Sequence, residues 1–235
     1  HRDQAPWITM HATGNKPRDH GIYAAIEALF RLSPPYPAID LEPYYTGWMH
    51  QNNVVAGERP DPDSDRDNYF SRAQMYGCVL SGGLAGHVHG TAAYDVSVDT
   101  EPAGARPYFW QALRYRSAAY MKSLARFVMS EGSRYRELEL ASDALTPRKA
   151  DSRRDSGLDG WSFMMRTSSK DFALLYFENQ AHRARSAGWK PNSAYSFAWF
   201  NTQSGEWQTG APLRADAKGE MQPPPFPGGV EVAGT

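Results

Sequence analysis

The chain has 235 residues, and its 25 Lys and Arg against 26 Asp and Glu give a formal net charge of -1. This balance argues against a nucleic-acid-binding protein, whose affinity depends on neutralising phosphates, and against a polybasic membrane-surface binder. Charged residues make up 22% and hydrophobic residues 41%, which is typical of a soluble globular protein. A stretch of about 18 apolar residues, as a transmembrane helix requires, does not occur. The single cysteine excludes an internal disulfide and a cysteine-cluster zinc site.

Expected strands and helices alternate through the first part of the chain. The expected strands are residues 7–12, 38–45 and 84–90, and the expected helices are 21–32, 68–80 and 109–130, with a polar loop at 46–67. This alternation predicts parallel strands covered by helices. A complete (β/α)8 TIM barrel takes about 250 residues, so three units correspond to roughly the second half of one.

The pattern changes near residue 140. Residues 143–160 are charged and rich in turn formers, and short aromatic runs follow at 161–166, 172–177 and 195–200. Such runs at close spacing predict an antiparallel β-sandwich, and residues 201–205 fit a hairpin turn. We therefore expect two domains: residues 1–140, the second half of a catalytic barrel, and residues 141–235, a β-sandwich accessory domain.

Two carboxylates follow the second expected strand. Glu42 stands at its end and precedes Pro43, and Asp40, two residues earlier, points to the same side of a regular strand. Because strand carboxyl ends form the active site of a TIM barrel, Glu42 could act as nucleophile or general base, and the pair could form a coupled site. The alternatives are that Asp40 pairs within the barrel and that Glu42 forms a salt bridge.

Three histidines lie near expected strand ends. His11 ends the first strand and would face the same cleft as Glu42, and His87 and His89 share one strand face. Such a pair suggests a metal, with His11 or Glu42 as third ligand. Alternatively, the imidazoles bind substrate or carboxylates, or are structural.

Aromatic residues and one arginine complete the candidate set. Tyr44, Tyr45 and Trp48 follow Glu42 and suit stacking on a sugar ring, or else they pack as a loop over the barrel mouth. Arg72 lies within a helix and could orient a carboxylate, although a surface ion pair is the commoner arrangement. The sequence has no G-x-S-x-G, G-x-G-x-x-G or phosphate-loop motif, which argues against phosphoryl and dinucleotide chemistry.

These segments together resemble a known family. The strand end from Asp40 to Tyr45, the helix bearing Arg72, and the glycine- and histidine-rich segment 80–90 are similar to the apiosidase-like glycoside hydrolases of family 140. Residues 8–11 resemble the preceding barrel strand of that family, and the likeness covers about residues 7–210. The family's final part is a small β-sandwich often labelled a collagen-binding domain, although nothing in this sequence supports collagen binding.

The resemblance implies a retaining glycosidase that acts on a polysaccharide, with Glu42 as nucleophile. The acid/base carboxyl of such an enzyme lies about 5 Å from the nucleophile, on an earlier strand that this chain lacks. The expected substrate-binding residues are His11, Asp40, Tyr44, Tyr45, Trp48, Arg72, His87 and His89. His89 replaces a tyrosine of the family, which bears on substrate identity. We expect no cofactor and no metal, and secretion or export to the periplasm.

Two other functions remain open, and the first half of the barrel must come from a segment outside the expected three units. A metal-dependent hydrolase would use His87, His89 and His11 as ligands, and a non-catalytic carbohydrate-binding protein would keep the scaffold without the proton donor. The chain begins at His1 without an initiator Met or signal segment, so we expect a processed or truncated polypeptide. Half a barrel leaves strand edges unpaired, so we expect an uncovered apolar face on residues 7–130 and a partner segment that supplies the first half.

Overall fold

The computed structural model describes residues 7–14, 21–34, 36–47, 61–93, 108–146, 148, 161–178 and 184–225. These residues form two compact units, the first ending at Ser117 and the second beginning at Ala118. Residues 118–140, which we assigned to the first domain, group with the second unit, and the domain boundary after residue 140 stays a prediction. Among the described residues, no helix has the length and apolar character needed to cross a membrane.

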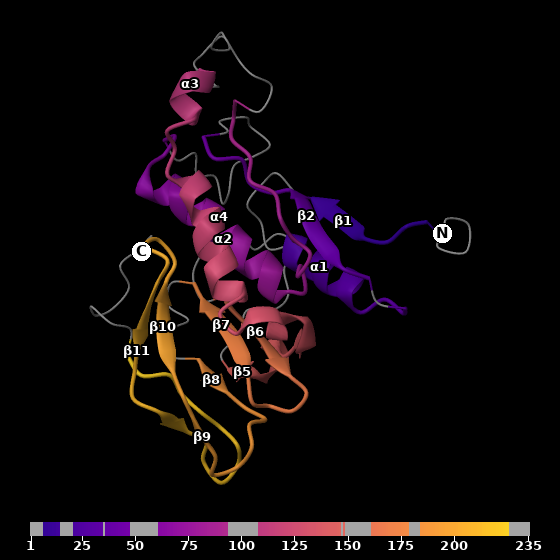
Figure 1. The fold of residues 1–235 in the computed structure, drawn as a ribbon, viewed down its shortest axis with the longest axis vertical. Coiled ribbons are helices and arrows are strands. Elements are labelled where there is room, and N and C mark those ends of the chain that lie inside the picture. Colours follow the sequence, from indigo (N-terminus) through magenta and orange to yellow (C-terminus); the bar gives the residue numbers. More distant parts are fainter. Residues whose placement is uncertain are drawn as a thin grey trace. The chain divides into compact units, whose positions relative to one another are not determined.

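The first unit contains a parallel three-stranded sheet (Figure 1). Strands β1 (His11–Gly14), β2 (Ala38–Glu42) and β3 (Gly86–His87) are hydrogen-bonded in that order. The strand order equals the chain order, and a helix connects each described strand to the next. The expected alternation of parallel strands and helices is therefore confirmed for these elements, although β1 begins later than the sequence predicts and β3 is shorter.

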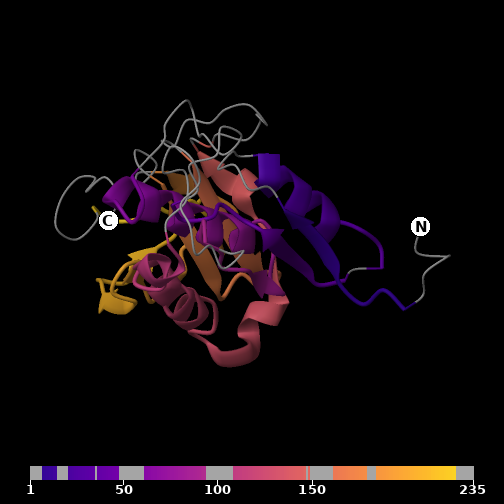
Figure 2. The same ribbon diagram turned by 90° about the horizontal axis from the view of Figure 1, so that it is seen from above.

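Two helices connect these strands. Helix α1 (Gly21–Phe30) lies alongside β1 and β2 (Figures 1 and 2) and buries Ile22 and Ile26. Helix α2 (Asp65–Leu80) begins at Ser64, whose hydroxyl accepts a hydrogen bond from the N–H of Asp67 at 3.1 Å. This side chain satisfies one of the backbone donors that a helix start leaves open.

The contact between α1 and α2 requires a glycine. The Tyr23 hydroxyl of α1 donates a hydrogen bond to the carbonyl of Ala73 in α2 at 3.3 Å. A Cβ atom on Gly77 would lie 2.4 Å from the Tyr23 ring, far inside van der Waals contact. Gly77 therefore allows the tyrosine ring to lie directly on the backbone of α2.

Pairing continues beyond the sheet at its carboxyl end. Thr46, after β2, forms a parallel bridge with Thr91, after β3. The N–H of Thr46 donates to the carbonyl of Gly90 at 3.2 Å, and the N–H of Ala92 donates to the carbonyl of Thr46 at 2.9 Å. The two segments that leave the sheet are therefore held to each other.

The prediction of a single helix at residues 109–130 is wrong, because this region contains two separate helices. Helix α3 (Phe109–Ala112) ends before α4 (Ser117–Val128) begins. Between them, the backbone N–H of Arg116 donates to Asp63 Oδ1 at 3.0 Å rather than to a carbonyl one turn back, and its guanidinium binds Asp65 at 2.9 Å. These long-range contacts replace the hydrogen bonds that a continuous helix would need.

The second unit is built from antiparallel strand pairs. Strands β4 (Leu138–Leu140), β6 (Ser162–Thr167) and β7 (Ala173–Phe177) form one sheet, and the other pairs are β5 (Leu145–Thr146) with β8 (Arg185–Ser186), β9 (Ala194–Tyr195) with β12 (Leu213–Arg214), and β10 (Ala198–Asn201) with β11 (Glu206–Thr209). The run expected at 195–200 divides between β9 and β10, whereas the predicted hairpin turn at 201–205 is confirmed. Short 3-10 helices η3 (Gly132–Glu137) and η4 (Ser142–Ala144) flank β4. The two-layer sandwich itself stays a prediction.

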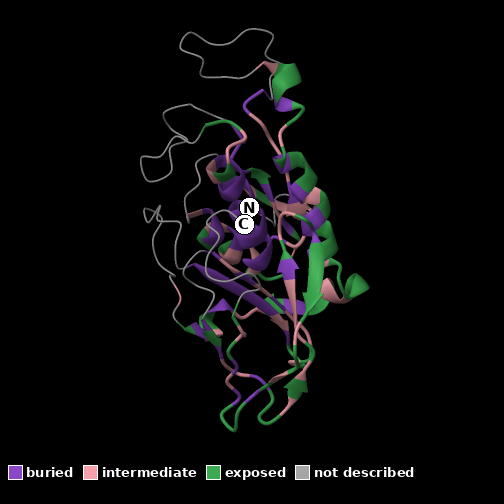
Figure 3. Ribbon diagram, turned by 90° about the vertical axis from the view of Figure 1, so that its left-hand side faces the viewer, coloured by how far each residue is buried: buried purple, intermediate pink, exposed green. Residues whose placement is uncertain are grey.

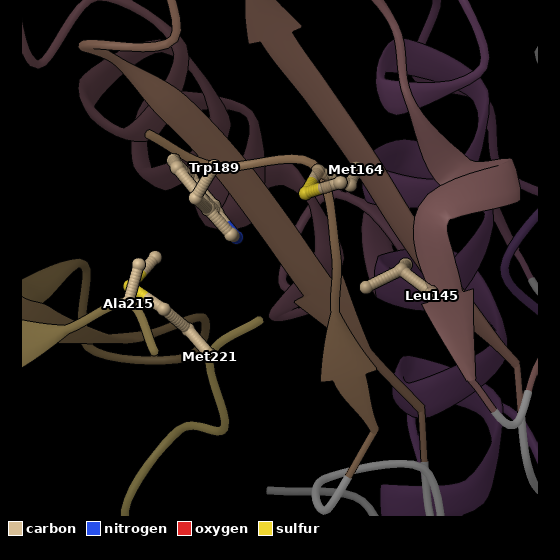
Figure 4. Close-up of a cluster of buried hydrophobic side chains, with 5 residues drawn as sticks. All are labelled: Leu145, Met164, Trp189, Ala215 and Met221. Atoms are coloured by element: carbon tan, nitrogen blue, oxygen red, sulfur yellow. The ribbon is translucent and has the colours of Figure 1, made fainter. Parts of the chain in front are cut away.

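An apolar cluster lies between these short strands (Figure 4). Its buried members are Leu145, Met164, Trp189, Ala215 and Met221. The Trp189 indole N–H is satisfied by Ser186 Oγ at 2.8 Å. The cluster therefore joins side chains from distant parts of the sequence without leaving its one indole donor unpaired.

Candidate active site

The carboxyl end of the parallel sheet presents the exposed carboxylate of Glu42. Glu42 is the last residue of β2 and is exposed, and its partner on β1 is Gly14. The register between β1 and β2 is irregular at this point, since Thr13 pairs with Asp40 but Gly14 pairs with Glu42. Glu42 thus lies where the active sites of parallel α/β enzymes form, and its side chain is accessible to a ligand.

Gly14 is required for this arrangement. A Cβ atom on Gly14 would lie 2.5 Å from the Cβ of Glu42 and 2.8 Å from its backbone nitrogen. Any larger residue would displace the β2 backbone at the candidate nucleophile. This role of Gly14 was not predicted, although a Thr-Gly pair after an expected strand indicates a bulge or a close approach of another backbone segment.

Asp40 is buried and does not form an open pair with Glu42. Its side chain is fully buried, and its carboxylate accepts hydrogen bonds from the Cys78 thiol of α2 at 3.3 Å and from the backbone N–H of Glu42. Burial raises the pKa of Asp40 to about 7, against the lowering effect of both hydrogen bonds. Asp40 is therefore closed to solvent and holds the backbone of Glu42, and its expected contact with substrate stays a prediction.

The two histidines of β3 and its exit differ in exposure. His87 pairs with Asp40 in register, is buried, and places Nδ1 3.5 Å from Asp40 Oδ2. Burial lowers the pKa of His87 to about 3 and also lowers the pKa of the partly exposed His89. Because the pKa of Asp40 is raised as well, the contact between His87 and Asp40 joins two neutral groups, rather than an ion pair, between about pH 3 and pH 7. His89 follows His87 by two residues along the chain, just as Glu42 follows Asp40, the register partner of His87.

His11 lies at the opposite end of the sheet. It is the first residue of β1 and pairs with Ala38, the first residue of β2. Four residues separate Ala38 from Glu42, a distance of about 13 Å along a strand. The prediction that His11 shares a cleft with Glu42 is therefore wrong, as is a metal site that joins His11 to His87 and His89. The His11 ring packs on Tyr36, with ring centres 5.6 Å apart.

Tyr44 holds the segment after β2 onto α2. Its hydroxyl donates to Asp67 Oδ1 at 2.7 Å, and its backbone N–H donates to Gln74 Oε1. Asp67 also accepts from the N–H groups of Gly47 at 3.1 Å and Asp63 at 2.9 Å, and burial raises its pKa to about 6. Tyr44 is only 2% exposed, so its face is not open to a sugar, and the alternative of a packed loop is confirmed for it.

Tyr45 is also enclosed. It is 8% exposed, and a Cβ atom on Gly90 would lie 2.3 Å from its ring. The glycine after His89 therefore leaves room for this ring, and sugar stacking on Tyr45 is not supported. Trp48, the third aromatic residue of the expected platform, lies outside the described residues.

Residues 2–133 match the family model described as apiosidase-like, catalytic domain. The chain belongs to the apiosidase-like family. Two solved structures resemble this apiosidase-like chain over 99% of its length: a protein described as a glycoside hydrolase, with a TM-score of 0.71 and 16% identity, and a glycoside hydrolase family 5 protein from Bacteroides vulgatus, with a TM-score of 0.70 and 17% identity. The chain covers 52% and 49% of these two chains, about half the length of each. At such identities the likeness establishes the fold. No match was found among curated proteins.

Arg72 of the apiosidase-like chain is a buried residue of α2. It is only 2% exposed, so the alternative of a surface ion pair is wrong. Burial raises the pKa of Tyr76, and the charge on Arg72 partly opposes this shift. Most of α2 is buried although many of its residues are polar (Figure 3). The role of Arg72 toward a catalytic carboxylate stays a prediction.

Proposed function

We propose that the chain is the part of a retaining glycosidase that carries the nucleophile, Glu42. The observation that supports this most strongly is an exposed carboxylate at the carboxyl end of a parallel sheet, in a member of the apiosidase-like family. In a retaining mechanism this carboxylate attacks the anomeric carbon and forms a glycosyl-enzyme intermediate, which water then hydrolyses.

The surroundings of Glu42 suit a nucleophile that must hold one position. Gly14 lets the β2 backbone approach β1 closely, and the Asp40 carboxylate accepts the N–H of Glu42. These contacts fix the main chain while the side chain stays exposed. His89, neutral and partly exposed at the exit of β3, is a candidate donor or acceptor for a sugar hydroxyl. The family is named for apiosidase, so polysaccharides that contain apiose are the first substrates to test.

The mechanism also needs a second carboxyl group, about 5–5.5 Å from the nucleophile in a retaining enzyme. Asp40 is buried and cannot protonate a leaving group in solvent reach. We therefore place the acid/base carboxyl on a segment beyond this chain that completes a (β/α)8 barrel. Two observations support this: the chain spans about half of the structures it matches, and Leu41, next to Glu42 on β2, is 43% exposed. By the same family inference we propose a β-sandwich accessory domain and export to the periplasm or beyond.

The test must not depend on the missing acid. A 2-deoxy-2-fluoro glycoside with a dinitrophenolate leaving group needs no protonation of that group, and its fluorine slows breakdown of the glycosyl-enzyme. We expect such compounds, beginning with an apioside, to add one glycosyl group to the peptide that contains Glu42, as located by mass spectrometry.

Two variants decide the assignment. Glu42→Gln should abolish the adduct, whereas Glu206→Gln, which changes an exposed glutamate of β11, should leave it unchanged. An adduct on another carboxylate, or equal labelling of Glu42→Gln, would reject Glu42 as the nucleophile. Binding of glycans without any adduct would favour a non-catalytic carbohydrate-binding protein.

A further inference from the structure

A second cluster of reactive side chains lies among β2, α2 and β3. Asp40, Cys78 and His87 come from these three elements, and all three are buried. One oxygen, sulfur or nitrogen atom of each lies within 4.8 Å of the other two. Asp40 also accepts the backbone N–H of Glu42, but no side chain of the cluster takes part in the bond-making steps of the proposed glycosidase.

Two atoms of this cluster lack a hydrogen-bond partner among the described residues. They are Asp40 Oδ1 and His87 Nδ1, on side chains that are 0% and 2% exposed. Buried polar atoms are nearly always paired in folded proteins, because an unpaired one loses its hydrogen bonds to water without replacement. The imidazole nitrogen lies 3.5 Å from Asp40 Oδ2 without a hydrogen bond, which is compatible with a ligand bound by both groups.

The distances fit a tetrahedral metal ion. Zinc binds sulfur at about 2.3 Å and nitrogen or oxygen at about 2.0–2.1 Å, so tetrahedral ligand atoms lie roughly 3.3–3.6 Å apart. Cys78 Sγ is 3.3 Å from Asp40 Oδ2, and His87 Nδ1 is 3.5 Å from the same oxygen. These two separations therefore match the edges of such a site, and one ligand atom of each of the three residues lies within 4.8 Å of the others.

Charge and ligand type also favour zinc over other ions. A thiolate and a carboxylate carry two negative charges, which a divalent ion neutralises, so the buried site becomes neutral overall. Thiolate and imidazole ligands are typical of zinc and unusual for calcium or magnesium, which prefer oxygen. A neutral imidazole is the form that binds a metal.

We propose that Asp40 Oδ2, Cys78 Sγ and His87 Nδ1 supply three of the four ligands of a zinc ion that ties α2 to β2 and β3. The Cys78 thiol releases its proton to solvent when the zinc–sulfur bond forms, and Asp40 releases any proton that it holds when the zinc–oxygen bond forms. Because no preformed site exists in an unfolded chain, zinc binding stabilises the folded state, and its effect grows with zinc concentration. This site differs from the histidine cluster expected from the sequence, since it excludes His11 and His89.

The test compares zinc content and cobalt spectra of the whole chain with those of two variants. Cys78→Ser retains a hydroxyl that can donate to Asp40 but removes the thiolate, so it separates metal binding from a simple hydrogen bond. His89→Ala is the matched control, since it changes a neighbouring histidine that the site does not use. The protein is refolded in zinc or cobalt, because the site is buried, and is then freed of loose metal.

We expect stoichiometric zinc in the wild type and in His89→Ala, and a thiolate-to-cobalt charge-transfer band in their cobalt forms. Cys78→Ser should lack both. The melting temperature of the wild type should rise with added zinc and fall with a chelator, which also decides the question if Cys78→Ser does not fold. Equal metal contents in wild type and Cys78→Ser, or a wild-type melting temperature unaffected by zinc and chelator, would overturn the proposal. Labelling of Glu42 by fluoro-glycosides is a separate readout, so failure of one proposal does not imply failure of the other.

Discussion

Polar groups fill much of the interior around α2, whereas the second unit buries an apolar cluster. In the first unit, Asp67, Arg72 and Gln74 of α2 are all nearly inaccessible to solvent. In the second unit, Met164 is a buried member of the apolar cluster that also contains Trp189. Buried polar groups depend on the geometry and protonation of their partners, while apolar groups depend mainly on volume. The stability of the unit with the candidate active site should therefore depend on pH and on single polar substitutions, whereas the stability of the other unit should depend on cavities in its apolar cluster.

The largest expected effect is a loss of stability when a side chain is removed from the apolar cluster of the second unit. Met164 is fully buried, so Met164→Ala leaves a cavity and should lower the free energy of unfolding by about 2–5 kcal/mol. Met129, which is 57% exposed in the same unit, gives the matched control, and Met129→Ala should change little. Urea unfolding of the two variants measures both. Equal losses in the two variants would mean that burial does not determine stability in this unit.

The next effect is a pH dependence of stability caused by a buried carboxyl group of the first unit. Asp67 has a folded-state pKa near 6, above its unfolded value of 3.8, so the folded protein keeps a proton that the unfolded chain loses. The free energy of unfolding should therefore fall as the pH rises from about 4 to about 6, by at most about 3 kcal/mol from this group, and its contribution should then stay constant. Urea unfolding at several pH values should show a smaller fall in Asp67→Asn.

Asp65 provides the control for this pH effect. It lies in the same first turn of α2, but its side chain is 82% exposed. Asp65→Asn should keep the wild-type pH profile. If Asp67→Asn and the wild type lost stability in parallel between these pH values, the buried carboxyl would not be the titrating group.

The smallest of the three effects concerns the backbone under Glu42. Gly14→Ala inserts a methyl group where 2.5 Å separates it from the Cβ of Glu42, and overpacking of this kind costs about 1–3 kcal/mol. The variant should also react more slowly with fluoro-glycosides at Glu42, because the β2 backbone must shift. Ala12→Ser, an exposed change in the same strand, should behave as wild type in both measurements. Unchanged stability and labelling of Gly14→Ala would show that the strands can separate freely at this point.

Local pattern was enough to predict several elements of this fold. The 3.6-residue spacing of apolar side chains located α2 to within three residues of its start, and the alternation of strands with helices predicted the parallel sheet. A polar residue at the end of an apolar strand made Glu42 the candidate nucleophile, and the structure leaves Glu42 exposed at the carboxyl end of β2. The turn residues 201–205 located the hairpin of β10 and β11. Each of these signals lies within one short stretch of sequence.

The errors arise where partners distant in sequence decide the outcome. The helix expected at 109–130 is interrupted before Ser117, where Asp63, 53 residues earlier, accepts the N–H of Arg116. Tyr44 turns inward because Asp67 accepts its hydroxyl hydrogen, and Asp40 turns inward to Cys78, 38 residues away. The position of His11 was wrong because strand pairing, rather than composition, sets where β1 begins, and a shift of that start moves a side chain to the other end of the sheet.

The bridge between Thr46 and Thr91 has a consequence for recognition. Two backbone hydrogen bonds join the segments that leave β2 and β3, just beyond Glu42 and His89. The backbone at Thr46 and Thr91 is therefore held in place before anything binds. Little chain entropy of these two positions would be lost on association, so their share of the affinity for a sugar ring would come from pre-organisation.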